Sequence, residues 1–254
     1  GTSTIGGSIA GSTALVGGFD VDLAEDWTLG LLASMGSSAI TAGNASTDSF
    51  DLSAGLYGAR EWGRLALRFG GSLTHHSVGS RRRVTGPGVD EMLVGSYGAL
   101  TGQFFAELAQ EFDFGPVGLE VFGDVAYARH MSPGFTETGG AGALTVAASS
   151  SDAIDTTLGA RITQQVAMGT RLMTLGATIG WKHRWTAVPT TYNSFAGAAP
   201  FPVAGISTAG SALVAGANLR LDLDEQSGLD VAYAFEWGST GAAHSFSAKY
   251  AHRF

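Results

Sequence analysis

The last twelve residues of the chain, 243–254, alternate between apolar and polar side chains and end on a bare aromatic residue. Successive side chains of a β-strand point to opposite sides, so the apolar members share one side. A soluble domain rarely leaves one side of its final strand entirely apolar. A membrane β-barrel does so routinely, because one side meets lipid and the other a wet interior. The apolar side holds Phe246, Ala248, Tyr250 and Phe254, and the polar side holds Ser245, Ser247, Lys249 and Arg253.

Ten further segments alternate in the same way, which gives eleven readable strands. In one of them, Leu119, Val121 and Val125 alternate with Glu120 and Asp124. Each segment alone is a weak signal. Their regular succession predicts an all-β fold, a transmembrane antiparallel up-and-down β-barrel that occupies residues 1–254 as a single domain. The segments are 12–23, 27–40, 49–61, 65–76, 96–112, 117–130, 151–164, 171–185, 209–223, 228–238 and 243–254.

Short and long connections alternate along the chain. Outer-membrane barrels have short periplasmic turns and longer extracellular loops. We therefore expect the C-terminus in the periplasm and the long loops outside the cell. The short connections are 24–26, 62–64, 113–116, 166–170 and 224–227; the long ones are 41–48, 78–95, 131–150 and 186–207; only 239–242 departs from the pattern.

Eleven strands leave the ring one strand short, because bacterial single-chain barrels carry an even number of strands. Counting back from a periplasmic C-terminus places Gly1 on the outer side. Either a twelfth strand lies upstream of Gly1, which we favour, or residues 2–10 form a short first strand.

Composition narrows the alternatives. The net charge of −8 argues against a nucleic-acid partner. The chain has no cysteine, so disulfides and thiolate metal sites are excluded. Mean hydropathy is slightly positive, yet no apolar run approaches the ~20 residues that a membrane helix needs. No signal peptide opens the chain, and we expect a fragment or a processed product. No cofactor or metal is expected.

A series of motifs resembles the autotransporter β-domain, the C-terminal translocator of type V secretion. No single motif is decisive, and their order and spacing carry the resemblance over nearly the whole chain. The motifs are G-G-F-D-V-D-L at 17–23, L-Y-G-A-R-E-W at 56–62, Q-F-F-A-E-L at 103–108, the segment 135–161, G-W-K-H at 180–183 and F-A-G-A-A-P-F-P-V-A-G at 195–205.

The resemblance implies a twelve-stranded bacterial outer-membrane barrel that anchors an N-terminal passenger and mediates its secretion to the cell surface. It also implies an α-helix in the lumen that joins the barrel to the passenger; neither that helix, the passenger nor an aromatic first strand is visible here. The implied partners are outer-membrane lipid and lipopolysaccharide, the barrel assembly machinery, and the protein's own passenger and linker helix. We expect a monomer. The C-terminal strand is similar to the signal read by the assembly machinery, with Phe246, Tyr250 and Phe254 as its residues.

Charged residues of both signs fall on the predicted inner side. A wet interior requires polar side chains, and mixed signs cross-link a narrow lumen; alternatively, some of these residues contact the linker helix or the passenger. Glu107, Glu120 and Asp124 are the leading candidates, because they lie on adjacent strands and can pair with basic groups. The full set is Asp20, Arg68, Glu107, Glu120, Asp124, Arg161, Lys182, Arg220, Asp230, Glu236, Lys249 and Arg253.

Aromatic residues near strand ends or on the lipid side fit the girdles that mark membrane interfaces. The residues assigned to them are Trp27, Tyr127, Trp181, Tyr233 and Trp237, with Trp62 and Trp185 as further members.

A basic run and a group of histidines each have two possible interpretations. Arg81, Arg82 and Arg83 form a basic run in a long outer loop, which is either solvated or binds lipopolysaccharide phosphates through bidentate guanidinium contacts. His75, His76 and His130 lie near the outer ends of strands, where Asp90 or Asp152 can approach, as a barrel protease or lipase would require.

The sequence contains neither G-x-S-x-G nor H-E-x-x-H, so we expect no enzymatic activity. A stand-alone porin or channel is the first alternative to the translocator, and a barrel protease or lipase is the second.

Overall fold

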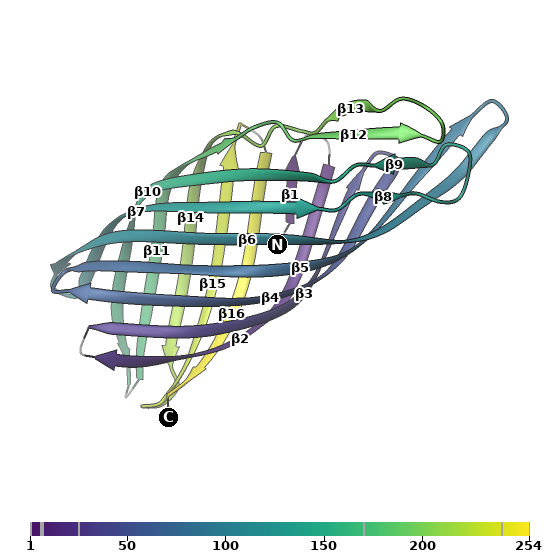
Figure 1. Cartoon of the computed structure of the whole chain (residues 1–254). Coiled ribbons are helices and arrows are strands. Elements are labelled where there is room, and N and C mark those ends of the chain that lie inside the picture. Colours follow the sequence, from purple (N-terminus) through teal and green to yellow (C-terminus); the bar gives the residue numbers. More distant parts are fainter. Residues whose placement is uncertain (1, 6–7, 25, 170, 240, 254) are drawn as a thin grey trace.

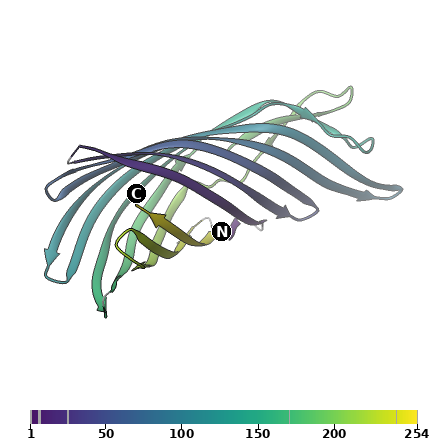
Figure 2. The same ribbon diagram turned by 90° about the horizontal axis from the view of Figure 1, so that it is seen from below.

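The computed structural model describes residues 2–5, 8–24, 26–169, 171–239 and 241–253. Within these residues, eleven long strands form one continuous antiparallel sheet that curls around a central space (Figures 1 and 2). The strands are β2 (Ser8–Ala24), β3 (Trp27–Ala42), β4 (Ala45–Trp62), β5 (Leu65–Gly86), β6 (Val89–Phe114), β7 (Val117–Ser132), β10 (Ser149–Met168), β11 (Arg171–Thr186), β14 (Gly210–Asp222), β15 (Ser227–Gly238) and β16 (Gly241–His252).

A short strand, β1 (Thr2–Ile5), closes the ring. It pairs on one side with Ser8–Gly11 of β2 and on the other with Gly241–His244 of β16. Figure 2 shows the N-terminus beside the C-terminal hairpin. Of the two explanations for the missing strand, the second holds in part. A short strand does lie within residues 2–10, but residues 8–10 already belong to β2. Beyond the residues that pair with β1, β2 pairs only with β3 and β16 only with β15 among the described residues. A strand segment upstream of Gly1 stays a prediction.

The two faces of the sheet follow the alternation predicted from the sequence. Large apolar side chains on the outward face are exposed; Leu15, Leu158 and Phe246 are 71%, 64% and 70% accessible. Polar and charged side chains meet one another on the inward face, as Asp51 does with His76 and Tyr57 with Asp20. The outward surface is therefore apolar enough to face lipid, and the inward surface is wet.

Tight turns join the strands at one rim, which we call the short-turn rim. Gly63 lies between β4 and β5 with φ at 62°, a conformation that glycine adopts without steric cost. The backbone N–H of Glu61 donates to the carbonyl of Asp26 at the same rim. Short connections therefore cluster where the sequence places them.

At the opposite, long-loop rim the sequence prediction was wrong in part, because three of the four expected loops contain ordered strands and the fourth, 41–48, is reduced to a two-residue turn between β3 and β4. Residues 78–95 continue β5 and β6 into a hairpin that projects beyond the barrel (Figure 1). The connections β7–β10 and β11–β14 pair into a second sheet in the order β13-β12-β9-β8. Its strands are β8 (Phe135–Thr136), β9 (Leu144–Val146), β12 (Thr190–Phe195) and β13 (Phe201–Ala204).

Two carboxylates fasten the second sheet to the projecting hairpin. Glu137 is 8% exposed, receives hydrogen bonds from the Arg82 guanidinium and also accepts the backbone N–H of Leu144. Glu91 accepts the N–H groups of Ala141 and Gly142. These contacts satisfy loop backbone donors that have no strand partner.

Among the described residues, no helix is long and apolar enough to cross a membrane.

We predict that the two faces respond differently to an added charge. Ile179 lies on the outward face of β11 and is 60% exposed, so Ile179→Arg should lower the free energy of unfolding by about 2–4 kcal/mol if the site is near the bilayer centre. Thr178→Arg, one residue away on the inward face, should cost far less. Urea unfolding in lipid vesicles measures both variants, and equal losses would show that the faces have been assigned incorrectly.

Candidate functional site

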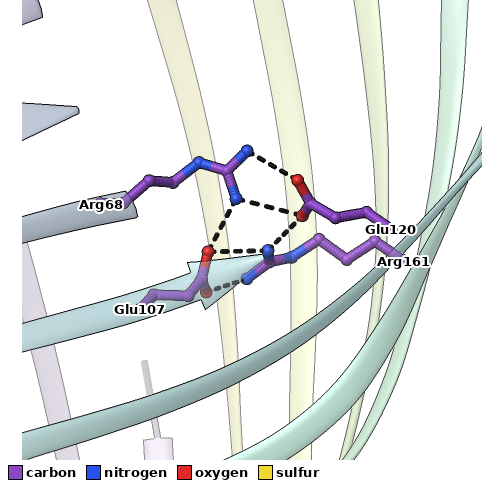
Figure 3. Close-up of polar contacts among 4 residues, drawn as sticks. All are labelled: Arg68, Glu107, Glu120 and Arg161. Atoms are coloured by element: carbon purple, nitrogen blue, oxygen red, sulfur yellow. Dashed lines mark hydrogen bonds and ion pairs between the residues drawn. The ribbon is translucent and has the colours of Figure 1, made fainter. Parts of the chain in front are cut away.

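The most highly connected polar cluster of the inward face is a ring of four charges contributed by four consecutive strands (Figure 3). Arg68 lies on β5, Glu107 on β6, Glu120 on β7 and Arg161 on β10. Antiparallel register places Arg68 opposite Glu107, and Glu120 opposite Arg161. Because each residue occupies an inward position of its strand, all four side chains project to the same side at the same level. We call these residues the lumen quartet.

Each arginine of the quartet contacts both glutamates. Arg68 donates from Nη2 to Glu120 at 2.7 Å and from Nη1 to Glu107 at 2.7 Å. Arg161 donates from Nη2 to Glu107 and from Nη1 to Glu120, each at 2.5 Å. The paired guanidinium and carboxylate edges match the bidentate geometry that makes such contacts strong and directional. The quartet therefore links β5 to β10 by side chains as well as by backbone.

The quartet is only partly shielded from the lumen. The Glu107 side chain is 10% exposed, whereas those of Arg68 and Arg161 are 39% and 31% exposed. The Arg161 guanidinium also lies 3.8 Å from the centroid of the Phe122 ring. That ring has room because Gly159 carries no Cβ, which would come within 2.6 Å of Phe122. The Phe122 ring and the ion pairs with Glu107 and Glu120 thus together fix the position of the Arg161 guanidinium.

A pocket of about 470 Å³ borders the quartet, and its other walls include Phe105, Thr178 and Asn218. It opens on the same side of the wall as the quartet, so the charged groups face a space that a polypeptide or water can enter. Chemically, the arrangement presents fixed hydrogen-bonding groups without an isolated charge.

The remaining predicted lumen residues occupy inward positions with varied partners. Lys182 pairs with Glu236, and Arg220 lies 3.1 Å from Asp222 and 3.8 Å from Asp230. Asp20 accepts the hydroxyl of Tyr57. Lys249 is opposite Asp230 in the register, and the backbone N–H of Arg253 donates to Gln226.

Asp124 differs from the expectation for it. It is opposite Glu107 in the register, but it hydrogen-bonds Thr157 rather than a basic group. No arginine or lysine pairs with it in the described part of the chain. The two arginines at this level are already shared by Glu107 and Glu120, which explains why the third carboxylate is left without an ion pair.

A second polar chain, which was not predicted from the sequence, crosses β4 to β7. His76 Nδ1 lies 2.7 Å from Asp51, and His76 Nε2 lies 2.8 Å from the Thr101 hydroxyl. That hydroxyl also lies 2.9 Å from His130 Nδ1. Carboxylate, imidazole and hydroxyl in this order are the parts of a hydrolase triad, but here a second imidazole bonds the hydroxyl oxygen. The arrangement favours Thr101 as a bridge between two histidines.

Strand alternation explains which histidines meet. His76 and His130 share the inward face, whereas His75 lies on the outward one. Asp152 is opposite Arg129 and is bonded by Tyr127 on the outward face, and Asp90 pairs with Arg83 in the hairpin. The idea that Asp90 or Asp152 approaches the histidines is therefore wrong. The carboxylate that does meet His76 is Asp51, and strand alternation could have identified it, because Asp51 lies at an inward position of its strand.

The same signal would have identified Asp155 and Arg184, whose side chains join at 2.6 Å and 2.5 Å. Both lie at inward positions of neighbouring strands, and neither was chosen from the sequence.

The basic run of the projecting hairpin is already paired. Arg81, Arg82 and Arg83 lie 3.5, 2.6 and 2.8 Å from Asp48, Glu137 and Asp90 respectively. The hydrogen bond from Arg83 holds the pKa of Asp90 below its ordinary value. Arg81 and Arg83 remain exposed at the hairpin surface.

The predicted girdle residues occupy outward positions at several levels. Trp27 is the first residue of β3 at the short-turn rim, and Trp237 lies near the long-loop end of β15. Trp181 stacks with His183, and Tyr127 bonds Asp152. Tyr233 lies near the middle of β15. Of the proposed C-terminal signal, Phe246 and Tyr250 are outward and exposed, and Phe254 lies outside the described residues.

Among the described residues, no group of three or more histidine, aspartate or glutamate side chains is arranged to hold a metal ion.

Comparison with known proteins adds family information to this geometry. The family model described as the autotransporter beta-domain matches residues 1–234. An extracellular serine protease of Serratia marcescens is 32% identical over 171 residues, which cover 66% of this chain and 16% of that protein. The chain thus spans about one sixth of that relative's length.

Solved structures show the same fold. The translocator domain of the autotransporter NalP from Neisseria meningitidis superposes with a TM-score of 0.83 at 18% identity, covering 100% of this chain and 85% of that one. The β-domain of the Bordetella autotransporter BrkA gives 0.76 at 17% identity, covering 100% and 95%.

We predict that the quartet is energetically coupled. Glu107→Gln should lower the free energy of unfolding by about 2 kcal/mol, less than the 3–5 kcal/mol of a fully buried pair, because both arginines are partly solvated. A double-mutant cycle with Arg161→Gln should give a coupling energy of about 1 kcal/mol.

The matched control is the exposed pair Arg64 and Asp113, whose side chains are 62% and 57% accessible. Its double-mutant cycle should be close to additive. Additive effects at Glu107 and Arg161 as well would mean that the quartet is not a coupled unit.

Proposed function

The chain belongs to the autotransporter β-domain family, and we propose that it anchors a passenger domain encoded upstream of Gly1 and mediates that passenger's secretion to the cell surface. Translocator domains of this family are transport barrels of the bacterial outer membrane. The observation that carries the proposal is the contrast between an apolar outward face and an inner wall of paired charges. A bilayer accepts the former, and a hydrated polypeptide can pass the latter.

We assign the short-turn rim and the C-terminus to the periplasm, and the projecting hairpin and second sheet to the outside. This orientation follows the distribution of turns and loops in outer-membrane barrels. The outer sheet and hairpin then form an ordered platform beside the exit. Lipopolysaccharide is the proposed neighbour of the hairpin, where the exposed Arg81 and Arg83 lie.

The lumen residues are proposed contacts of the linker helix or the passenger. Lys249, Arg253 and Asp124 are the best placed, because none of them has an ion pair in the described part of the chain. The four charges of the quartet, in contrast, are all paired with one another, and we propose that the quartet stiffens the barrel wall instead of contacting the passenger. The whole of residues 1–254 acts as one unit, and we propose a monomer.

We further propose that the barrel does no covalent chemistry. The Thr101 hydroxyl lies between two imidazoles, which restricts its approach to a substrate. The name of the Serratia relative describes a protein of which this chain spans 16%, so its protease activity is not transferred to this barrel.

The function is tested in the parent protein, with an epitope placed in the region upstream of Gly1. Antibody binding and protease shaving of intact cells should detect the epitope at the surface when the barrel is inserted. Insertion is followed separately by the gel mobility of unheated samples. A barrel that inserts while the epitope remains inaccessible would contradict the translocator proposal, and steady conductance without any passenger would support a stand-alone channel.

We predict that Phe254→Ser reduces the amount of assembled barrel severalfold, because the terminal aromatic residue belongs to the proposed assembly signal. Arg253→Gln, the adjacent inward position, should assemble normally and serves as the control. The measurement is the fraction of folded protein in isolated outer membranes. Equal assembly of both variants would remove the terminal aromatic residue from the proposed signal.

We predict that His76→Gln and His130→Gln leave passenger release and surface display unchanged, with at most a modest loss of stability. The reason is that both histidines serve as hydrogen-bonding groups of the inner wall. If either variant abolished release of the passenger while the barrel stayed folded, the enzyme alternative would replace the present proposal.

A further inference from the structure

The outward face carries an arginine, Arg60, close to the end of a strand. Arg60 lies on β4 at the same alternation as the exposed lipid-face residues Leu52 and Leu56. It is two residues from the end of the strand, at the short-turn rim, and is opposite Trp27 in the register. A guanidinium so near the end of the strand reaches the membrane interface, where long basic side chains place their charge at the level of the lipid headgroups.

Two indole rings hold this guanidinium. Its Cζ lies 5.0 Å from the centroid of the Trp27 ring and 4.6 Å from that of Trp62. Phe69 meets Trp27 edge-on with ring centroids 6.3 Å apart. Gly58 makes room for Phe69, because a Cβ there would come within 2.8 Å of its ring. The aromatic contacts cover the guanidinium and orient it, and they supply no counter-charge.

Nothing in the described part of the chain neutralises Arg60. Its Nε is buried without a hydrogen-bond partner, and no carboxylate lies within ion-pair distance of it. Glu61 follows directly in sequence, but alternation directs its side chain to the inward face. By contrast, the outward-facing Arg83 and Arg129 each pair with an aspartate. Arg60 is thus a fixed cation in an aromatic girdle, and its two terminal Nη groups, unlike the buried Nε, are the donors available to an external anion.

We propose that Trp27, Arg60 and Trp62 form a binding site for the phosphate of a glycerophospholipid in the leaflet at the short-turn rim. A phosphate accepts two parallel N–H bonds from a guanidinium, and tryptophan is enriched at the depth of lipid headgroups. The acyl chains would lie along the exposed apolar surface of β4. The site requires only that the barrel spans a bilayer, so it stands independently of the passenger.

The test uses native mass spectrometry of the complete chain in detergent, titrated with dioleoylphosphatidylglycerol. Arg60→Gln should weaken binding of the first lipid about tenfold or more, because it removes charge-assisted hydrogen bonds. Arg60→Lys should give an intermediate loss, since it keeps the charge without the bidentate geometry. Arg64→Gln, which removes a cation at the same rim, is the matched control and should bind as the parent does.

Two further probes identify the ligand. Dioleoylglycerol has the same acyl chains without phosphate and should bind at least tenfold more weakly. Millimolar inorganic phosphate should fail to displace the lipid. Unchanged binding by folded Arg60→Gln, equal binding of dioleoylglycerol, or displacement by inorganic phosphate would each overturn the proposal. Gel mobility of unheated samples shows that each variant is folded, and Arg60→Lys carries the test if Arg60→Gln is not.

Discussion

Backbone hydrogen bonding is the constraint on which the rest of this structure depends. A bilayer offers no partner for an exposed N–H or C=O group, so a membrane-spanning sheet must close on itself. The chain meets this requirement with long antiparallel strands, and β1 closes the ring over Ser8–Gly11 of β2 and Gly241–His244 of β16. Closure then separates two solvents, because alternating side chains face lipid on one side and water on the other. The polar wall and the apolar surface are two results of one backbone arrangement.

Much of the barrel was predictable because the period of two is a local property. Alternation correctly places Val121 outside and Glu120 inside, since each side follows from immediate neighbours. Ion-pair partners depend on register, which is set by turns and pairing along whole strands. Arg161 therefore meets both Glu107 and Glu120, whereas the adjacent Asp124 meets Thr157. Alternation identifies the candidates, and register selects the pairs.

The long-loop rim shows a different limit. Its segments are rich in glycine, serine and threonine and carry little alternation, so they resemble ordinary loops. They become strands through contacts between regions distant in sequence, such as Glu137 with Arg82 and β9 with β12. No local pattern encodes these tertiary contacts. The same applies to Arg60, whose significance emerges only when Trp27 of the neighbouring strand and Trp62 are placed around it.

The composition of the lumen quartet has an electrostatic consequence. Two arginines and two glutamates sum to zero charge, and their mutual contacts cancel most of the field that each would project into the lumen. The quartet itself therefore adds little net potential to the lumen, and the charge at this level that has no ion-pair partner among the described residues is Asp124. For the proposed passenger, the quartet would oppose acidic and basic segments about equally, and any electrostatic preference at this depth would come from Asp124.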